Sequence, residues 1–226
     1  MPWMYKKIVH KISDNTQRNS VSHQFRNKRF QFFLTLLKEI PKPLTILDIG
    51  GTVDFWKAMN FNEPDVRIIL LNLEETPNVP EPFVSVKGDA TNLKEFANKS
   101  VDIVFSNSVI EHLYTWENQQ KMAKEVQRVG KYHFIQTPNY WFPIEPHWVF
   151  PFFQFFPKRI QYWLTQHFQL GHIPRKPNFE DARRQVDEIK LLSKREYAQL
   201  FPDSTIYMEK FAGFNKSFVA YSKRMG

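Results

Sequence analysis

Short apolar runs that alternate with polar, helix-forming segments constrain the fold of this chain more than any other feature. Five such runs occur, at residues 44–49, 66–71, 83–86, 101–105 and 132–135. Candidate helices lie between them, at residues 53–60, 91–98 and 109–129. Short, almost wholly apolar runs are typical of strands that are buried on both faces. Strands that alternate with helices predict a parallel sheet with helices on both faces, joined by right-handed crossovers.

Helical and strand patterns continue on both sides of the five runs. Apolar residues recur at helical spacing from about Ser22 to Ile40, and the sequence PKP at 41–43 ends that helix. Towards the C-terminus, Ser193 is placed to cap a helix, and the stretches STIYMEKF and KSFVAYS predict two further strands. We therefore expect a single Rossmann-like α/β domain over residues 1–226, with a mostly parallel sheet of seven strands.

Residues 139–187 interrupt this alternation after the fifth strand and are dense in aromatic residues and prolines. Within about 30 residues, from 140 to 168, this segment holds twelve aromatic residues: Tyr140, Trp141, Phe142, Trp148, Phe150, Phe152, Phe153, Phe155, Phe156, Tyr162, Trp163 and Phe168. Three interpretations stay open: a helical lid with a small core, an apolar substrate pocket, or a surface that contacts lipid. Pro151, Pro157 and the pair Lys158–Arg159 exclude a membrane-spanning helix but suit one lying at a membrane interface.

The chain is basic, with a net charge of +8. The first 30 residues hold one acid, Asp14, against seven basic residues: Lys6, Lys7, Lys11, Arg18, Arg26, Lys28 and Arg29. This balance favours nucleic acid, anionic lipid or phosphorylated substrates as partners, and it equally fits a solvated surface with a flexible arm at 1–21. The lack of cysteine excludes disulfides and thiolate chemistry. Since neither a membrane helix nor a signal peptide is recognisable, we expect a cytoplasmic protein, with peripheral contact at the inner membrane surface as a further expectation.

Polar turns follow four successive predicted strands. They read DIGG after the first strand, NLEE after the second, GDA after the third and SNSVIEH after the fourth. In an open α/β sheet, ligands bind beyond the carboxyl ends of the strands, and glycine lets the backbone approach a ligand closely. Each turn alone is a weak signal, but four in order predict a ligand site across these strand ends.

With the stretches ILDIGG, LLNLE, KGDATNL and VDIVFSNSVIEHL, the chain resembles the class I S-adenosylmethionine-dependent methyltransferases. The branch it resembles includes the ubiquinone and menaquinone methyltransferases. The resemblance covers about residues 44–136 and, more loosely, the closing strands. It implies S-adenosylmethionine as the cofactor. It also implies that Gly50 and Gly51 wrap the methionine part of that cofactor, with Asp48 steadying the turn.

The resemblance assigns the remaining cofactor contacts. Asn72, with Glu74 as the nearest acid, maps onto the residue that binds the ribose. Asp89, followed by Ala90, maps onto the acid that contacts the adenine, and Ser106 and Asn107 would line the cofactor near its sulfonium.

The chain departs from the family pattern in two places. Thr52 and Asp54 stand where the family's loop has glycines, and Asn72 replaces the usual ribose-binding acid. A threonine can present its hydroxyl to the cofactor carboxylate, and an asparagine can hydrogen-bond a hydroxyl. We therefore expect cofactor binding to be retained, although weakened.

Three residues are candidates for the catalytic group that handles the proton of the methyl acceptor: His112, His147 and Glu145. His147, in PIEPHW just beyond the fifth strand, is expected at the mouth of the site as a base or an acceptor contact; the alternative is a surface loop histidine. His112, beside Glu111, is expected to shape the site or only to buttress its helix. No spacing such as HExxH relates these residues or His172, so no metal site is predicted.

The leading interpretation is a methyltransferase that acts on a small-molecule, glycan or lipid-linked acceptor, with oxygen as the expected acceptor atom. An RNA methyltransferase is an alternative suggested by the charge, but nucleic acid is less favoured because SNSV replaces the Asn/Asp-Pro-Pro-aromatic turn of amino-methylating enzymes. A dinucleotide-dependent oxidoreductase would need GxGxxG after the first strand, which is absent. A non-catalytic scaffold with this fold is the remaining alternative.

Overall fold

The computed structural model describes residues 21–222. By its internal contacts the chain divides into two compact units. The first unit contains the described residues up to Phe32 together with Tyr140–Ile189, and the second contains Phe33–Asn139 and the chain from Lys190 onward. The predicted basic arm falls, except for its last position, on residues 1–20, which lie outside the described residues.

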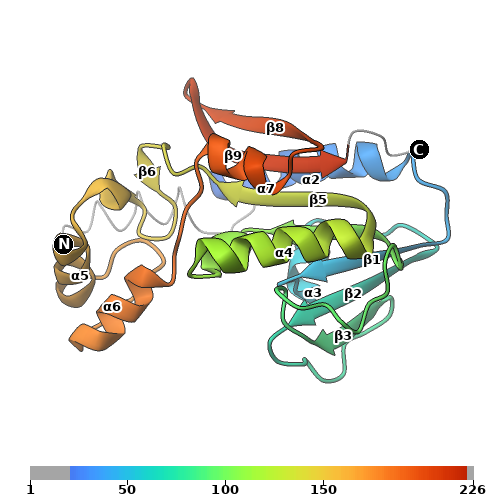
Figure 1. The fold of residues 1–226 in the computed structure, drawn as a ribbon, viewed down its shortest axis with the longest axis horizontal. Helices are drawn as coiled ribbons and strands as arrows, with labels where there is room; N and C mark the ends of the chain where they lie inside the picture. Colours follow the sequence, from blue (N-terminus) through green and yellow to red (C-terminus); the bar gives the residue numbers. More distant parts are fainter. Residues whose placement is uncertain (1–20, 223–226) are drawn as a thin grey trace. The chain divides into compact units, whose positions relative to one another are not determined.

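The second unit is built on a seven-stranded sheet. Its strands are β1 (Leu44–Ile49), β2 (Val66–Asn72), β3 (Phe83–Lys87), β4 (Val101–Asn107), β5 (Gly130–Pro138), β8 (Ser204–Phe211) and β9 (Phe214–Ser222). Their order is β3-β2-β1-β4-β5-β9-β8 (Figure 1). The first five strands are parallel, whereas β9 runs antiparallel to both β5 and β8. The predicted mostly parallel, seven-stranded Rossmann-like sheet is confirmed, and the strand order reverses between β1 and β4.

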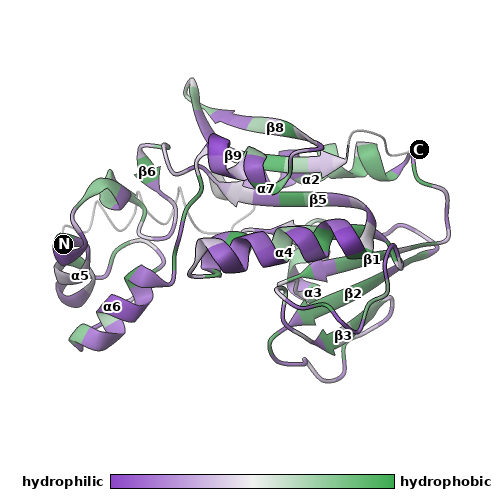
Figure 2. Ribbon diagram, viewed as in Figure 1, coloured by the Kyte–Doolittle hydropathy of each residue, from purple (hydrophilic) through white to green (hydrophobic). Residues whose placement is uncertain are grey.

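Each face of this sheet buries a different set of side chains, because successive residues of a strand point to opposite faces. On one face, α4 (Trp116–Val129) and α7 (Lys194–Leu200) share a mainly aliphatic core with Leu47 and Val104. Helix α4 is mostly hydrophilic in Figure 2, as expected for a helix that buries only one stripe.

The opposite face buries an aromatic cluster. Phe33, from the end of α2 (Val21–Leu37), packs edge-on against Phe105 and Phe134. Trp56 of α3 (Val53–Ala58) lies against the same cluster. The sheet is therefore covered on both faces, which fixes its strand ends as a rigid edge.

Two of the predicted helices are corrected by the structure. Residues 109–129 form a short 3-10 helix, η1 (Ile110–His112), and then α4, which Thr115 caps by accepting a hydrogen bond from Asn118 N. Residues 91–98 form turns instead of a helix. Their backbone groups bond to α4: Leu93 N donates to Glu125, and Arg128 donates to the carbonyl oxygens of residues 93 and 96. These side chains replace the helical hydrogen bonds.

The first unit contains the aromatic segment. Its elements are β6 (Ile144–Glu145), β7 (Phe150–Pro151), the 3-10 helix η2 (Phe153–Phe155), α5 (Lys158–His167) and α6 (Phe179–Asp187). Trp148 stacks on Phe153 at 4.3 Å and forms a small core with Leu170 and Val186. No helix within residues 21–222 is long and apolar enough to cross a membrane.

Candidate active site

The carboxyl ends of β1 to β4 lie in one row along an edge of the sheet. Ile49 is in register with Leu71 on one side and with Ser106 on the other. Backbone hydrogen bonds extend this row past the strands: Gly50 N donates to Leu71 O and Gly88 N donates to Asn72 O, both at 2.8 Å. The four polar turns of the sequence are therefore neighbours in space, at the switch point where such sheets bind ligands.

The two glycines after β1 are required by the close packing of their neighbours. Gly50 has φ +74°, a left-handed conformation that side chains rarely adopt, and a Cβ there would overlap Val109, which follows β4. A Cβ on Gly51 would overlap the Asp48 carboxyl group. At Gly50 the loop thus exposes backbone in a place where no side chain fits, which suits close approach by a ligand, whereas Gly51 is buried beside Asp48.

Asp48 supports this loop from inside the protein. Its side chain is buried, and Trp56 Nε1 donates to its Oδ2 at 2.7 Å. Burial raises the pKa of Asp48 to about 8, although the Trp56 hydrogen bond opposes this rise. The family resemblance implied that Asp48 steadies the turn but did not identify Trp56 as its partner. The only sign of this contact was the general rule that a buried tryptophan N–H, such as that of Trp56, needs a hydrogen-bond acceptor.

Asn72 joins the second turn to the first. Its Nδ2 donates to the carbonyl oxygen of Gly51 at 2.9 Å, which leaves Oδ1 as the acceptor that can face a ribose hydroxyl. Glu74, the nearest acid, is exposed and pairs with Lys87 at 3.1 Å. The side chain of Asn72 is therefore more firmly positioned than that of Glu74.

Asp89 and Ala90 form the third turn. Asp89 Oδ1 accepts from both the backbone N and the Oγ1 of Thr91, each at 2.8 Å, and the Asp89 side chain stays exposed. Ala90 is buried in the core. This arrangement holds the Asp89 carboxylate at the row of strand ends, where it can accept from an exocyclic amine.

Thr52 and Ser106 both use their hydroxyl groups within the protein. Thr52 Oγ1 accepts from Phe55 N at 3.2 Å and so caps α3, while its O–H can still donate to a ligand. Ser106 is fully buried, and its Oγ donates to Ile49 O at 3.1 Å. The Ser106 hydroxyl thus ties β4 to β1, and a cofactor contact by this residue would have to come from its backbone. Asn107, partly exposed, is the next residue at that strand end.

Glu145 and His147 form a tight pair within the first unit. The buried Glu145 accepts from His147 Nδ1 through Oε1 at 2.7 Å. Its Oε2 accepts from the backbone N of His147 and of Trp148, both at 2.7 Å. A carboxylate on Nδ1 favours the tautomer whose proton lies on Nδ1, so Nε2 becomes the basic nitrogen.

Glu111 and His112 lie in η1 of the second unit. Glu111 is fully buried, and its Oε2 accepts from Thr137 Oγ1 at 3.1 Å. Its backbone oxygen accepts from Lys190 N at 2.7 Å. Glu111 therefore ties η1 to β5 and to the segment before α7, and His112, which is partly exposed, follows it.

Comparisons with known proteins find one matching family model and several solved structures with a similar fold. Residues 53–133 match a family model described as a methyltransferase domain. No curated protein matches the chain. The CurJ carbon methyltransferase structure is similar with a TM-score of 0.55 and 9% identity, over 96% of this chain and 57% of that chain.

Two further solved structures are similar. A putative Zn-dependent alcohol dehydrogenase from Rhodobacter sphaeroides has a TM-score of 0.53 and 12% identity, over 88% of this chain and 99% of that chain. A SAM dependent methyltransferase from Aquifex aeolicus has a TM-score of 0.44 and 14% identity, over 83% of this chain and 87% of that chain. At such identities these likenesses concern the fold alone.

The matched segment contains the turns after β2, β3 and β4, and the glycine loop of β1 precedes it directly. The cradle at Gly50 and Gly51 and the exposed Asp89 fit a cofactor that carries an amino acid at one end and a purine at the other. The chain therefore contains a class I methyltransferase domain, whose cofactor is S-adenosylmethionine.

Proposed function

We propose that the enzyme methylates an oxygen of a small-molecule, glycan or lipid-linked acceptor, within the branch that includes the ubiquinone and menaquinone methyltransferases. The bound cofactor supplies an electrophilic methyl group. The protein then has to orient the acceptor and remove its proton, because a neutral hydroxyl is a weak nucleophile. Methylation at oxygen therefore requires a protein group that is poised to take this proton.

The Glu145–His147 pair is the observation that carries this proposal. The Glu145 carboxylate is held by three hydrogen bonds of 2.7 Å, so it cannot turn away from the imidazole. An imidazole fixed in this way keeps Nε2 as a proton acceptor, and a bound carboxylate stabilises the imidazolium that forms. In this proposal His147 is the general base and Glu145 is a positioning residue that acts through it.

The row of strand ends supplies the cofactor contacts of the proposal. The Gly50–Gly51 backbone and the Thr52 hydroxyl would hold the amino acid portion, and Asn72 Oδ1 would accept from a ribose hydroxyl. Asp89 would accept from the adenine amine. Each of these groups lies in the second unit, on elements that a rigid sheet holds in place.

The first experiment tests cofactor binding and the class of acceptor. S-adenosylmethionine binding is measured by calorimetry for the wild type, for Gly50→Ala and for Gly213→Ala. Gly213 also has a positive φ, of +84°, but a Cβ there meets nothing within 4 Å, so Gly213→Ala is the matched control. We expect micromolar to submillimolar binding that only Gly50→Ala weakens, by about tenfold or more. If the wild type does not bind S-adenosylmethionine, the proposal fails and the non-catalytic scaffold is the remaining interpretation.

Methyl-labelled cofactor then identifies the acceptor. The enzyme is incubated with separated fractions of small molecules, lipid-linked glycans and RNA, and the product bond is analysed by mass spectrometry. A methyl ether in either of the first two fractions supports the proposal. Label that is recovered in RNA and released by ribonuclease would overturn it in favour of the RNA alternative.

The second experiment tests the base with whichever acceptor is labelled. His147→Gln should lower kcat by about a hundredfold or more while leaving cofactor affinity unchanged. Glu145→Gln should also lower kcat and alter its pH profile, because a glutamine amide that donates to Nδ1 would move the imidazole proton to Nε2. Normal turnover in His147→Gln would show that His147 only packs in the first unit.

A further inference from the structure

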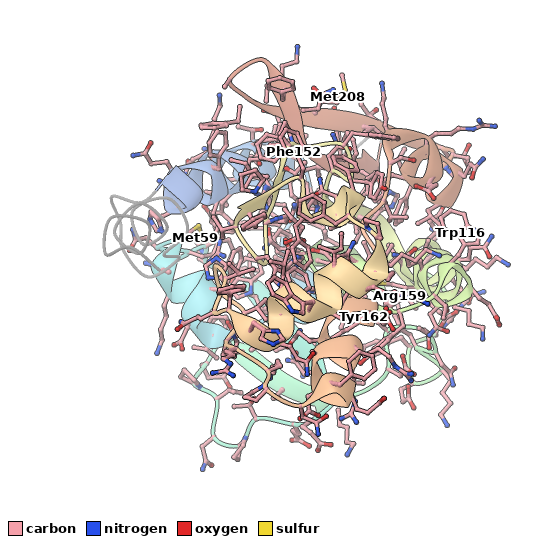
Figure 3. All side chains as sticks on the ribbon, turned by 90° about the vertical axis from the view of Figure 1, so that its left-hand side faces the viewer. Met59, Trp116, Phe152, Arg159, Tyr162 and Met208 are labelled. Atoms are coloured by element: carbon pink, nitrogen blue, oxygen red, sulfur yellow. The ribbon has the colours of Figure 1, made fainter. Side chains whose placement is uncertain are left out.

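Helix α5 of the first unit buries two polar residues and exposes two large apolar residues, although Tyr162 and Leu164 pack against the core. Gln161 and Thr165 are 6% and 1% exposed, whereas Ile160 and Trp163 are 45% and 51% exposed. A surface helix ordinarily shows the opposite pattern, with an apolar stripe facing the core. Figure 3 is viewed from the side of α5 and α6, with Arg159 and Tyr162 labelled on α5.

Hydrogen bonds explain why the polar residues of α5 face inward. Thr165 Oγ1 accepts from Trp148 Nε1 at 2.9 Å and donates to the carbonyl oxygen of Gln161 at 2.9 Å. Gln161 Nε2 donates to Phe156 O at 2.8 Å. Rotating the helix to bury Trp163 would break these buried bonds, and each buried polar group left without a partner is costly. The outward apolar face is therefore fixed by the core of the unit.

The exposed side chains of α5 form one continuous surface. Ile160, Trp163 and His167 are spaced three and four residues apart, so they lie on one face of the helix. His167 stacks on Trp163 at 4.9 Å, and Phe168, directly after the helix, packs edge-on against Trp163 at 5.5 Å. We name this set of four residues the outer face of α5.

Basic residues lie at the start of α5 and beside its second half. Lys158 and Arg159 begin the helix, and Arg175 and Lys176 lie along its second half, where Arg175 Nε donates to Gln166 O and Lys176 N donates to Thr165 O. No acidic residue occurs between positions 158 and 178. Lys158 pairs with Asp187 of α6, which leaves the surplus charge on the other three residues.

We propose that the outer face of α5 is a docking surface for an anionic phospholipid bilayer. Tryptophan, isoleucine and phenylalanine side chains on one face of a short helix enter the boundary between headgroups and acyl chains, and flanking basic residues meet the lipid phosphates. The charge complementarity favours an anionic membrane over an uncharged apolar partner. The inference does not depend on the proposed reaction, although it would bring a lipid-linked acceptor to the enzyme.

The test is cosedimentation of the full chain with sucrose-loaded vesicles. We expect binding to vesicles of phosphatidylcholine with 30 mol% phosphatidylglycerol, and loss of most of that binding in phosphatidylcholine alone or in 0.5 M NaCl. The double variant Ile160→Gln/Trp163→Gln should bind the anionic vesicles at least about tenfold more weakly. The double variant Arg159→Gln/Lys176→Gln should show a similar loss at low salt.

Phe214→Gln is the matched control, because Phe214 is 57% exposed in the second unit, outside the outer face. It should bind vesicles like the wild type, and circular dichroism should show that all variants are folded. As an independent readout, brominated acyl chains should quench tryptophan fluorescence in the wild type but less in Trp163→Phe, which retains binding. Equal vesicle binding by the wild type and the Ile160/Trp163 variant would overturn the proposal. The proposal would also be overturned if the wild type were a dimer and only the Ile160→Gln/Trp163→Gln variant were a monomer.

Discussion

Asn72 occupies the position at which the resembling methyltransferases carry a ribose-binding acid, and its amide makes a second contact here. Its Nδ2 donates to Gly51 O, so the residue that would meet the ribose also holds the glycine loop. A carboxylate could accept from a ribose hydroxyl but could not donate to the loop. The departure at the ribose position thus bonds to the glycine loop itself, at the residue directly before Thr52.

This coupling predicts the effect of restoring the family residue. Asn72→Asp should weaken S-adenosylmethionine binding about tenfold, because the new carboxylate would repel the Gly51 carbonyl oxygen and loosen the loop. Calorimetry measures the affinity. Asn78→Asp, which adds the same charge at an exposed position between β2 and β3, is the control and should bind normally. Tighter binding by Asn72→Asp would show that the ribose contact outweighs the loop contact.

At the residue scale, the sequence predicted the positions of the site residues better than it predicted their hydrogen-bond partners. It predicted which residues follow the strand ends, because four polar turns after four apolar runs mark one edge of a parallel sheet. It could not predict that Trp56 donates to Asp48 or that Ser106 bonds to Ile49 O, since these contacts depend on how the strands pair and which face each side chain takes. Whether the predicted cofactor residues contact S-adenosylmethionine stays a prediction.

At the scale of single elements, the strands were predicted well, whereas the predicted helix at 91–98 is absent and the one at 109–129 is divided into η1 and α4. All seven strands of the sheet occur at the predicted places. For the first five this is because short apolar runs have few alternatives to burial in a sheet. Ser193 caps α7 as predicted, and Glu196 completes a capping box. The predicted helix at 91–98 is wrong because its backbone partners come from Glu125 and Arg128, about 30 residues away, which local pattern cannot reveal.

The segment at 91–98 should therefore depend on Glu125. Glu125→Ala should destabilise the protein by about 1–2 kcal/mol in urea unfolding, because Leu93 N loses its acceptor and Arg128 loses its ion pair. Amide hydrogen exchange should rise first in residues 91–98. Glu125→Gln keeps an oxygen acceptor and should lose less. Glu117→Ala, which removes an exposed pair with Lys121 on the same helix, should have no measurable effect. Equal losses in the Glu125 and Glu117 variants would contradict this account.

At the scale of the whole molecule, sequence pattern predicted the topology because parallel strands with helical crossovers allow few arrangements. The division into two units was not predicted, although Tyr140–Ile189 of the first unit is nearly the aromatic segment that composition singled out at 139–187.

The stability of the whole fold also depends on two buried titratable groups, which only the structure reveals. Asp48 has its pKa raised to about 8 by burial, and His133 has its pKa lowered to about 4 by burial and by Lys99.

These two groups predict how stability varies with pH. The folded protein keeps a proton on Asp48 that the unfolded chain releases near pH 3.8, so this group alone makes stability fall as pH rises towards 8. His133 acts in the opposite sense between pH 4 and 6.5, where only the unfolded chain holds its proton, so the two effects largely cancel there. Between pH 6.5 and 8 the Asp48 effect stands alone.

The neutral variant Asp48→Asn isolates this effect. Its amide oxygen can still accept from Trp56 Nε1, but it has no proton to lose. The free energy of unfolding of the wild type should fall relative to this variant between pH 6.5 and 8, with a slope of at most about 1.4 kcal/mol per pH unit. Urea titrations at four pH values in this window measure the difference, in which the titration of all other groups cancels. Parallel pH dependences in the two proteins would mean that Asp48 is already ionised in the fold, held by Trp56 and by water that reaches it.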